Sequence, residues 1–235
     1  MRLFFVVVRI LALGTVVTAL ISRADCVFAT HTCRADNLLS YFTIQSNLAY
    51  AVLLAVLLVL GVAGWRERSW MTAVRMLLTT YLIVSGVTFC LLILNAGLSD
   101  IPFLVPASSK ILHFVIPAYA LIDFLLNPAR RRLRWAVLGV SLIFPALYGA
   151  YTLIRGPATG WYPYIFFDPA WTGSYAATGF YAAILAALIA AISAGLVATT
   201  RLTSPLQPFV AAVPAQTRAD RHDESARVAS TFDVR

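Results

Sequence analysis

The sequence predicts an all-α integral membrane protein, with six transmembrane helices in one bundle and both termini in the cytoplasm. Of its 235 residues, 60% are hydrophobic and only 12% are charged, and the mean hydropathy is +0.82. The apolar residues form six runs, each long enough to cross about 30 Å of hydrocarbon as a helix. A transmembrane β-barrel is excluded, because its strands would alternate polar and apolar positions. The runs cover residues 3–21, 39–62, 73–95, 109–126, 135–154 and 175–200.

The distribution of basic residues predicts the orientation of the bundle. Arginines concentrate in the connections at 63–75 and 127–134 and in the tail after Arg201, whereas the alternate connections carry few. Because basic loops stay in the cytoplasm, this pattern places both termini there. The net charge of +8 is thereby explained by topology, and no nucleic-acid partner is expected. The cluster Arg130–Arg134 is expected to meet anionic lipid headgroups.

The two ends of the chain differ in character. The first run resembles a secretory signal, but it is too long and lacks a small-residue cleavage site, so it is expected to remain as the first span. Arg9 within it is expected to snorkel towards the cytoplasmic surface. Polar residues and prolines without apolar periodicity predict a disordered cytoplasmic tail over 203–235. The six-helix bundle therefore occupies residues 1–202.

Two external connections carry distinctive residues. Cys26 and Cys33 lie seven residues apart, where a disulfide can form in an oxidising compartment. The stretch 156–169 is rich in aromatic residues and proline, which suits either an interfacial aromatic belt or a lid over the outer mouth of the bundle. Asp168 before Pro169 is expected to cap a turn into the sixth span. No Cys or His spacing is typical of a zinc or haem site, so no metal or cofactor is expected.

A stripe of polar residues marks one face of the second run. Thr43, Ser46, Asn47 and Tyr50 follow one another at positions i, i+3, i+4 and i+7. In lipid, such a stripe must face the interior of the bundle. One interpretation is structural, because small polar side chains hydrogen-bond between membrane helices.

His113 favours a functional interpretation of that stripe. An ionisable residue inside a span is costly and points to function. It lies about one turn from the outer start of the fourth run, a depth similar to that of Thr43 in the second, so the two side chains are expected to meet. Asp123 lies about 15 Å deeper along the same helix, too far to orient the imidazole. It is expected to pair with Arg130 or another basic residue near the inner boundary.

A hydroxyl beside an imidazole suits acyl transfer. The chain contains no G-x-S-x-G, H-E-x-x-H or Gly-rich phosphate loop. His113 would take the proton of Thr43, which would then attack an ester carbonyl. The lipid substrate would arrive laterally with its acyl chains still in the bilayer. Residues expected to bind the substrate or stabilise the oxyanion are Ser46, Asn47, Tyr50, Asn95, Tyr162 and Tyr164.

The starts of the second and fourth runs resemble the androgen-induced (FAR-type) membrane proteins. The similar segments are Tyr41-Phe42-Thr43-Ile44-Gln45-Ser46-Asn47 and His113-Phe114-Val115-Ile116-Pro117, and the similarity covers roughly residues 38–200. Members of that family are intramembrane hydrolases of fatty acid esters of hydroxy fatty acids that use a threonine and a histidine. The resemblance, through a bacterial branch of six-span proteins, implies Thr43 as nucleophile, His113 as its partner and a location in a bacterial plasma membrane.

Two other functions remain open at this point. In a non-catalytic bundle that binds lipid or organises partners, the polar stripe would only hold the helices together. In a small transporter, the aromatic connection would act as a gate, although the chain has no internal repeat of the kind that many transporters carry.

Overall fold

Six long helices form the body of the structure and confirm the predicted fold class. The computed structural model describes residues 2–65, 67–98 and 105–206, and the regular elements within these ranges are all helical. All six are long and apolar enough to span a membrane. They are α1 (Arg2–Phe28), α3 (Phe42–Ala63), α4 (Trp70–Leu98), the unit formed by α5 (Ala107–Lys110), the π-helical η1 (Ile111–Val115) and α6 (Ile116–Leu126), then α7 (Val137–Thr159) and α9 (Tyr175–Thr199).

Shorter elements occupy the connections: α2 (Ala35–Leu39), the 3₁₀ turn η2 (Ile165–Phe167) and α8 (Pro169–Thr172). The cap predicted at Asp168 is confirmed, because its carboxylate accepts a hydrogen bond of 2.9 Å from the backbone N–H of Ala170. Ser174 caps α9 in the same way, with a hydrogen bond of 3.1 Å from Ala177. Each cap satisfies a backbone donor that the first turn of a helix leaves without a partner.

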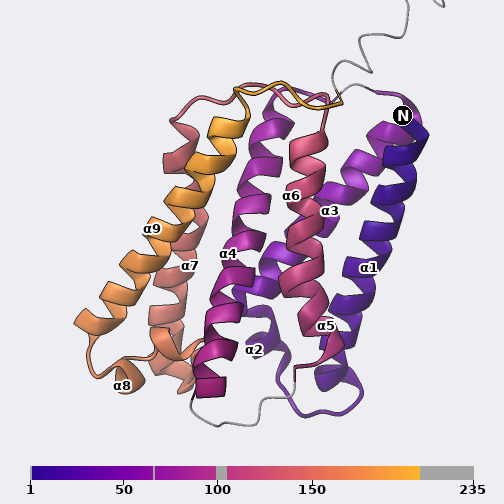
Figure 1. The fold of residues 1–235 in the computed structure, drawn as a ribbon. Coiled ribbons are helices and arrows are strands. Elements are labelled where there is room, and N and C mark those ends of the chain that lie inside the picture. The colour runs from indigo at the N-terminus through magenta and orange to yellow at the C-terminus, as the bar shows by residue number, and fades with distance from the viewer. Residues whose placement is uncertain (1, 66, 99–104, 207–235) are drawn as a thin grey trace, which may run out of the picture.

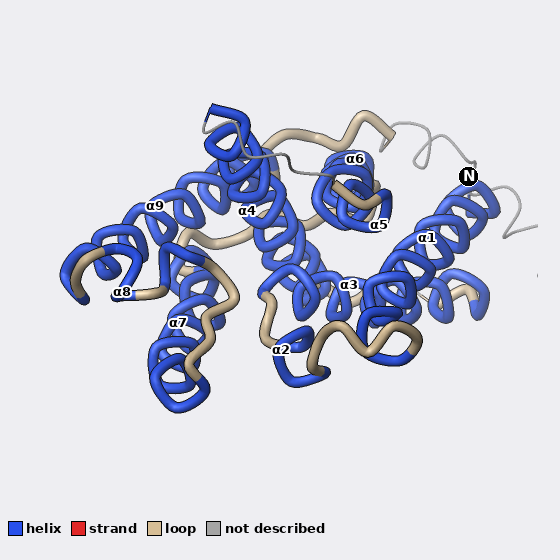
Figure 2. The backbone as a smooth tube through the Cα atoms, turned by 90° about the horizontal axis from the view of Figure 1, so that it is seen from below, coloured by secondary structure: helices blue, strands red, loops and turns tan. Residues whose placement is uncertain are grey.

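The helices alternate in direction across the bundle. Figure 1 shows the N-terminus, the α3–α4 and α6–α7 connections and the end of α9 at one end, with α2, α5 and α8 at the other. Viewed along the bundle, α4 lies between a group formed by α1, α3 and α6 and the pair formed by α7 and α9 (Figure 2). The central position of α4 allows it to contribute to sites on both sides.

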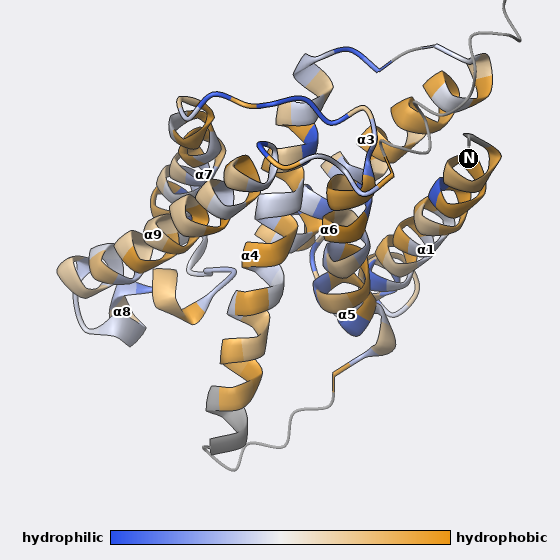
Figure 3. Ribbon diagram, turned by 45° about the horizontal axis from the view of Figure 1, so that its top comes forward, coloured by the Kyte–Doolittle hydropathy of each residue, from blue (hydrophilic) through white to orange (hydrophobic). Residues whose placement is uncertain are grey.

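Hydropathy distinguishes the two ends. The helices are mainly apolar, and the connection between α6 and α7 is hydrophilic (Figure 3). This connection contains the basic residues 130–134, so the positive-inside rule places its end of the bundle, with the N-terminus, in the cytoplasm. The predicted tail lies mostly outside the described residues. Its first part packs on the bundle, because the buried Ser204 hydroxyl donates a hydrogen bond of 3.0 Å to the Leu126 carbonyl.

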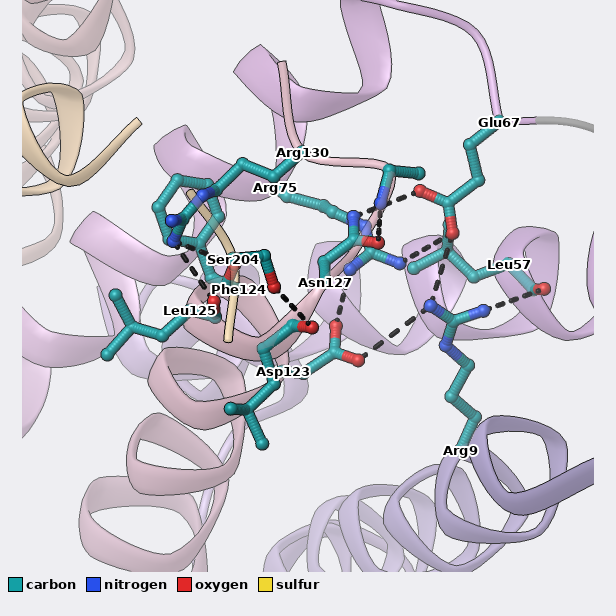
Figure 4. A network of polar contacts seen from close by, with 12 residues as sticks. Arg9, Leu57, Glu67, Arg75, Asp123, Phe124, Leu125, Asn127, Arg130 and Ser204 are labelled. Carbon is teal, nitrogen blue, oxygen red and sulfur yellow. Dashed lines mark hydrogen bonds and ion pairs between the residues drawn. The ribbon is translucent and has the colours of Figure 1, made fainter. Parts of the chain in front are cut away.

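A network of buried charges joins four segments at the cytoplasmic end (Figure 4). Arg75 of α4 donates to Asp123 of α6 at 2.7 Å and to Glu67 of the α3–α4 connection at 2.9 Å. Arg9 of α1 reaches the same Glu67 oxygen at 3.2 Å. The Asn127 amide donates to the other Glu67 oxygen at 3.2 Å. Two guanidinium groups and two carboxylates thus neutralise one another where water is largely excluded.

This network corrects the expectation for Arg9 and, of the alternatives left open for Asp123, selects the pairing with another basic residue. Arg9 does not snorkel to the surface, since its side chain is only 6% exposed and turns inwards to Glu67 and to Asp123. Asp123 pairs with Arg75 and Arg9, and Arg130 is not its partner. Arg130 lies beyond the end of α6 and donates to the carbonyl oxygens of Leu125 and Leu202. The last carbonyls of a helix lack partners within the helix, which makes them ready acceptors for such a side chain.

The disulfide predicted between Cys26 and Cys33 is present and closes the external connection that follows α1. α1 extends to Phe28, well beyond residue 21, where the first apolar run was predicted to end. Its last turns therefore lie outside the most apolar part of the helix. The disulfide therefore joins the last turn of a membrane helix to the loop that leads into α2. This loop is held against the outer end of the bundle, next to Tyr41.

Candidate active site

The two residues singled out by the sequence lie at the outer ends of neighbouring helices. Thr43 is the second residue of α3, which begins at Phe42 after the extended Tyr41. His113 is the central residue of the π-helical turn η1. Both therefore lie in the first turns of their spans, at the end of the bundle that carries α2 and α5.

The π-helical turn around His113 has a local cause. Pro117 has no backbone N–H and cannot donate to the carbonyl of His113 four residues earlier, and its ring crowds that carbonyl. The chain adapts with a wider turn, in which the N–H of Ile116 donates to the carbonyl of Ile111, five residues back. The freed His113 carbonyl lies against Gly86 of α4, at a position where any Cβ would clash with it. Pro117 and Gly86 together set the position of the imidazole.

Thr43 and His113 form a direct hydrogen bond, with 3.0 Å between Thr43 Oγ1 and His113 Nε2. The other ring nitrogen, Nδ1, lies 2.8 Å from the carbonyl oxygen of Ser109. A carbonyl can only accept, so in the neutral ring Nδ1 carries the proton and Nε2 presents its lone pair to Thr43. The Thr43 hydroxyl therefore donates to an imidazole that is oriented to accept its proton. This is the geometry of a nucleophile paired with a general base.

Two residues of α4 complete the surroundings of this pair. Ser85 Oγ lies 2.6 Å from Thr43 Oγ1, and because the Thr43 proton is directed to His113, Ser85 is the donor. The Phe89 ring stacks on the imidazole at 3.7 Å between centroids and at 13° between planes. Sequence reasoning missed both residues. The available signal was the spacing of Ser85, Phe89 and Leu92 at i, i+4 and i+7, which puts them on one helix face.

A cavity of about 640 Å³ adjoins the pair. Its wall is almost entirely apolar and is built by α4, α7 and α9, together with the aromatic stretch 164–167. Thr43, Ser85, Thr88 and His113 supply polar groups at its edge. Pro145 within α7 also lines it. A space of this size and polarity, with a few convergent polar groups, is typical of a site for an apolar ligand.

The aromatic connection contributes one of its two predicted tyrosines to this site. Tyr164 lines the cavity and stacks on Phe166 at 5.1 Å between centroids. Burial raises the pKa of the Tyr164 phenol. Tyr162 instead packs its ring on Gly156 in the last turns of α7 and does not line the cavity. The connection therefore covers part of the cavity, as expected of a lid, through Tyr164 and its neighbours.

The rest of the polar stripe lies away from the cavity. Ser46 donates to the Thr43 carbonyl at 3.2 Å. Asn47 donates to the carbonyl of Thr43 at 2.9 Å and to that of Leu112 at 3.3 Å, which joins α3 to η1. Tyr50 is buried and packs edge-on against Tyr119. Asn47 and Tyr50 thus join α3 to neighbouring helices, as the structural interpretation of the stripe expects, whereas Ser46 bonds within α3, and the structure brings none of the three to the cavity.

Asn95 belongs to α4, and its side chain lies outside the described part of the structure. Within residues 2–65, 67–98 and 105–206, no three His, Cys, Asp or Glu side chains are grouped so as to hold a metal ion. The functional groups that line the cavity are thus the hydroxyls of Thr43, Ser85 and Thr88, the phenols of Tyr148 and Tyr164, and the His113 imidazole.

Comparison of the chain with protein-family models, with curated proteins and with solved structures finds no match. Function must therefore be inferred from the site itself, whose chemistry is defined by a hydroxyl–imidazole pair at the edge of an apolar cavity.

Proposed function

We propose that this protein is an intramembrane hydrolase of long-chain lipid esters, in which Thr43 is the nucleophile and His113 is the general base. The observation that carries the proposal is the 3.0 Å hydrogen bond from Thr43 to a His113 ring whose other nitrogen is held by Ser109. The resemblance to the androgen-induced (FAR-type) proteins supports the same two roles and a substrate of the fatty acid ester of hydroxy fatty acid type. It also favours a bacterial plasma membrane as the location.

The proposed reaction has two halves. Thr43 Oγ1 gives its proton to His113 Nε2 and bonds to the ester carbonyl carbon, which forms a tetrahedral oxyanion. As the oxyanion collapses, the carbon–oxygen bond to the alcohol breaks, and the alcohol takes the proton from His113. Water then attacks the acyl-threonine with His113 again as base. Release of the fatty acid returns the proton to Thr43.

Two hydroxyls at the cavity suit the oxyanion. Ser85 Oγ lies 2.6 Å from the attacking oxygen, so it can turn its proton from Thr43 to the adjacent oxyanion as negative charge develops there. Tyr164 lines the same cavity next to Thr43. These two residues replace Ser46, Asn47 and Tyr50 as the proposed donors.

The apolar cavity suits the acyl chain of the substrate. Each methylene that leaves water for this wall contributes about 0.8 kcal/mol, so an ester already dissolved in the bilayer is best admitted laterally, without passing through water. The proposed lipid partners include anionic headgroups at the inner surface, where Arg131, Arg132 and Arg134 are exposed.

Labelling of the purified protein with a lipid-like fluorophosphonate tests the proposal. Wild-type protein should form an adduct on Thr43, located by mass spectrometry of the labelled peptide. Thr43→Ala and His113→Ala should lower labelling and hydrolysis of long-chain esters by about a thousandfold or more, because a nucleophile and its base act as one unit. Thr43→Ser should keep much of the labelling.

Thr88→Ala is the matched control. Thr88 lines the same cavity from α4 without a hydrogen bond to Thr43 or His113, so its loss should leave labelling almost unchanged. An adduct on Ser85 in the wild-type protein would reassign the nucleophile. Hydrolysis that survives Thr43→Ala at the wild-type rate would contradict the proposal and favour a bundle that only binds lipid.

A further inference from the structure

A second, polar cavity lies at the outer end of the bundle beside the candidate active site. Its volume is about 370 Å³. The last turn of α1, the disulfide-closed loop, α2 and the aromatic connection surround it. The polar and aromatic side chains in its wall include Arg23, His31, Arg34, Asn37, Tyr41 and Trp161.

Arg23 gives this cavity an uncompensated positive charge. Its side chain forms no ion pair and no hydrogen bond with any residue that the structure describes, although it is half-buried in the wall of the cavity. Arg34 and Arg155 differ, because both contact the Asp36 carboxylate, at 3.0 and 3.1 Å. A guanidinium that is half-buried and unpaired is costly, and an anionic ligand would offset that cost.

The polar cavity adjoins the candidate active site through Tyr41. Tyr41 lines the polar cavity, and the next two residues, Phe42 and Thr43, line the apolar one. Its ring contacts Trp161 and Tyr164 edge-on, at 5.6 and 5.9 Å between centroids. Arg23 lines the same polar cavity as Tyr41. The polar cavity thus ends at Tyr41, two residues before the nucleophile that lines the apolar one.

The disulfide holds this polar compartment together. Cys26 and Cys33 both line it, and the loop that they close supplies His31 and Thr32 to its wall. His31 adopts a left-handed backbone conformation, with φ of 52°, at the tip of that loop. Because α1 leaves the membrane here, the cavity lies at the depth of the lipid headgroups on the external side.

We propose that this cavity is an anion-binding subsite, in which Arg23 holds the carboxylate or phosphate headgroup of the lipid whose ester lies at Thr43. Guanidinium groups bind both anions through paired, charge-assisted hydrogen bonds. The subsite rests on the proposed function for its relation to the ester, but the anion site itself can be tested without catalysis. It assigns to Arg23 the recognition of the free acidic group that such an ester lipid carries.

Binding is tested first in catalytically inactive Thr43→Ala protein, held in a neutral detergent. Dodecanoate, dodecyl phosphate and dodecanol are titrated while the fluorescence of Trp161 is followed, with Trp161→Phe protein as the blank. We expect saturable binding of the two anions and none of the neutral alcohol. Adding Arg23→Gln should weaken binding of both anions about tenfold or more, because a hydrogen bond to a charged group contributes roughly 1.5–3 kcal/mol. Arg68→Gln, which changes an exposed arginine of the α3–α4 connection at the other end of the bundle, is the matched control.

Three results would overturn the proposal: equal binding of dodecanol, unchanged anion binding after Arg23→Gln, or, in a parallel titration with inorganic phosphate, equal affinity for inorganic phosphate and dodecyl phosphate. The last result would identify a site for a free anion and not for a lipid headgroup. Thermal unfolding of the Arg23→Gln protein should match that of its parent, so that weaker binding cannot be ascribed to misfolding.

Turnover then tests the relation to the ester. An ester of a hydroxy fatty acid with a free carboxylate is compared with its methyl ester, using wild-type Thr43. Arg23→Gln should raise KM for the acid about tenfold or more and leave the methyl ester unchanged. Equal effects on both substrates would overturn the subsite. Anion binding that depends on Arg23 in a protein that hydrolyses neither ester would instead reject the proposed function and leave the anion site standing.

Discussion

The outer and inner ends of the bundle each bury a cluster of polar side chains, and the two clusters differ in kind. The outer cluster consists of Thr43, Ser85 and His113. The inner cluster consists of Arg9, Glu67, Arg75 and Asp123. The outer one is uncharged when the imidazole is neutral, and it borders a cavity of about 640 Å³. The inner one is fully ionic, and none of its members lines that cavity.

This difference separates a reactive arrangement from a structural one. In the inner cluster, each carboxylate is paired with two guanidinium groups, so no group is free to react and each stabilises the others. In the outer cluster, the Thr43 hydroxyl is hydrogen-bonded to the His113 ring and also lines the apolar cavity. Polarity inside a membrane is therefore a poor guide to function until its access to a ligand is known.

Breaking the inner cluster should have the largest effect on stability. Asp123→Leu leaves the buried Arg75 and Arg9 to share the single carboxylate of Glu67, and we expect the free energy of unfolding to fall by about 3–5 kcal/mol. Thermal and chemical unfolding in detergent measure this loss. The double variant Arg75→Met with Asp123→Leu should recover much of it, because Arg9 and Glu67 still balance each other. A single variant as stable as the wild-type protein would contradict a structural role for the cluster.

Altering the outer cluster should affect rate more than stability. Ser85→Ala removes the donor 2.6 Å from Thr43 Oγ1, and we expect kcat to fall about a hundredfold with KM almost unchanged. The free energy of unfolding should fall by only about 1 kcal/mol, the net value of one hydrogen bond. Steady-state kinetics and unfolding of the same preparation test both parts. A large rise in KM with constant kcat would instead assign Ser85 to substrate binding.

The smallest expected effect concerns the ring that stacks on the imidazole. Phe89→Leu keeps the wall apolar but removes the stacked contact at 3.7 Å, which is worth about 0.5–1.5 kcal/mol. Because the His113 ring is then less restrained, we expect kcat to fall by up to about tenfold. Phe89→Tyr, which retains the aromatic face, should stay close to the wild-type rate. If Phe89→Leu leaves kcat unchanged, the hydrogen bond to Ser109 alone orients the ring.

Much of the fold could be predicted from the sequence, and so could the contact between Thr43 and His113 in the site. Hydropathy predicted the six spans, basic residues predicted the orientation, and the similar depths of Thr43 and His113 predicted their contact. These features depend on how each segment meets the bilayer, which is a local property of the chain. The sequence allowed a disulfide between Cys26 and Cys33 if their compartment is oxidising, and the structure contains that bond.

The remaining features depended on how each helix is rotated about its own axis. Side-chain packing across helix interfaces sets that rotation, and a span that is apolar all round carries little signal for it. Packing brought Ser85 to Thr43, placed Gly86 against the His113 carbonyl, and turned Asn47 and Tyr50 away from the cavity. It also paired Asp123 with Arg75 instead of Arg130. The sequence by itself determined which polar residues enter the membrane and at what depth, whereas only the tertiary structure decided which of them meet and which face open space.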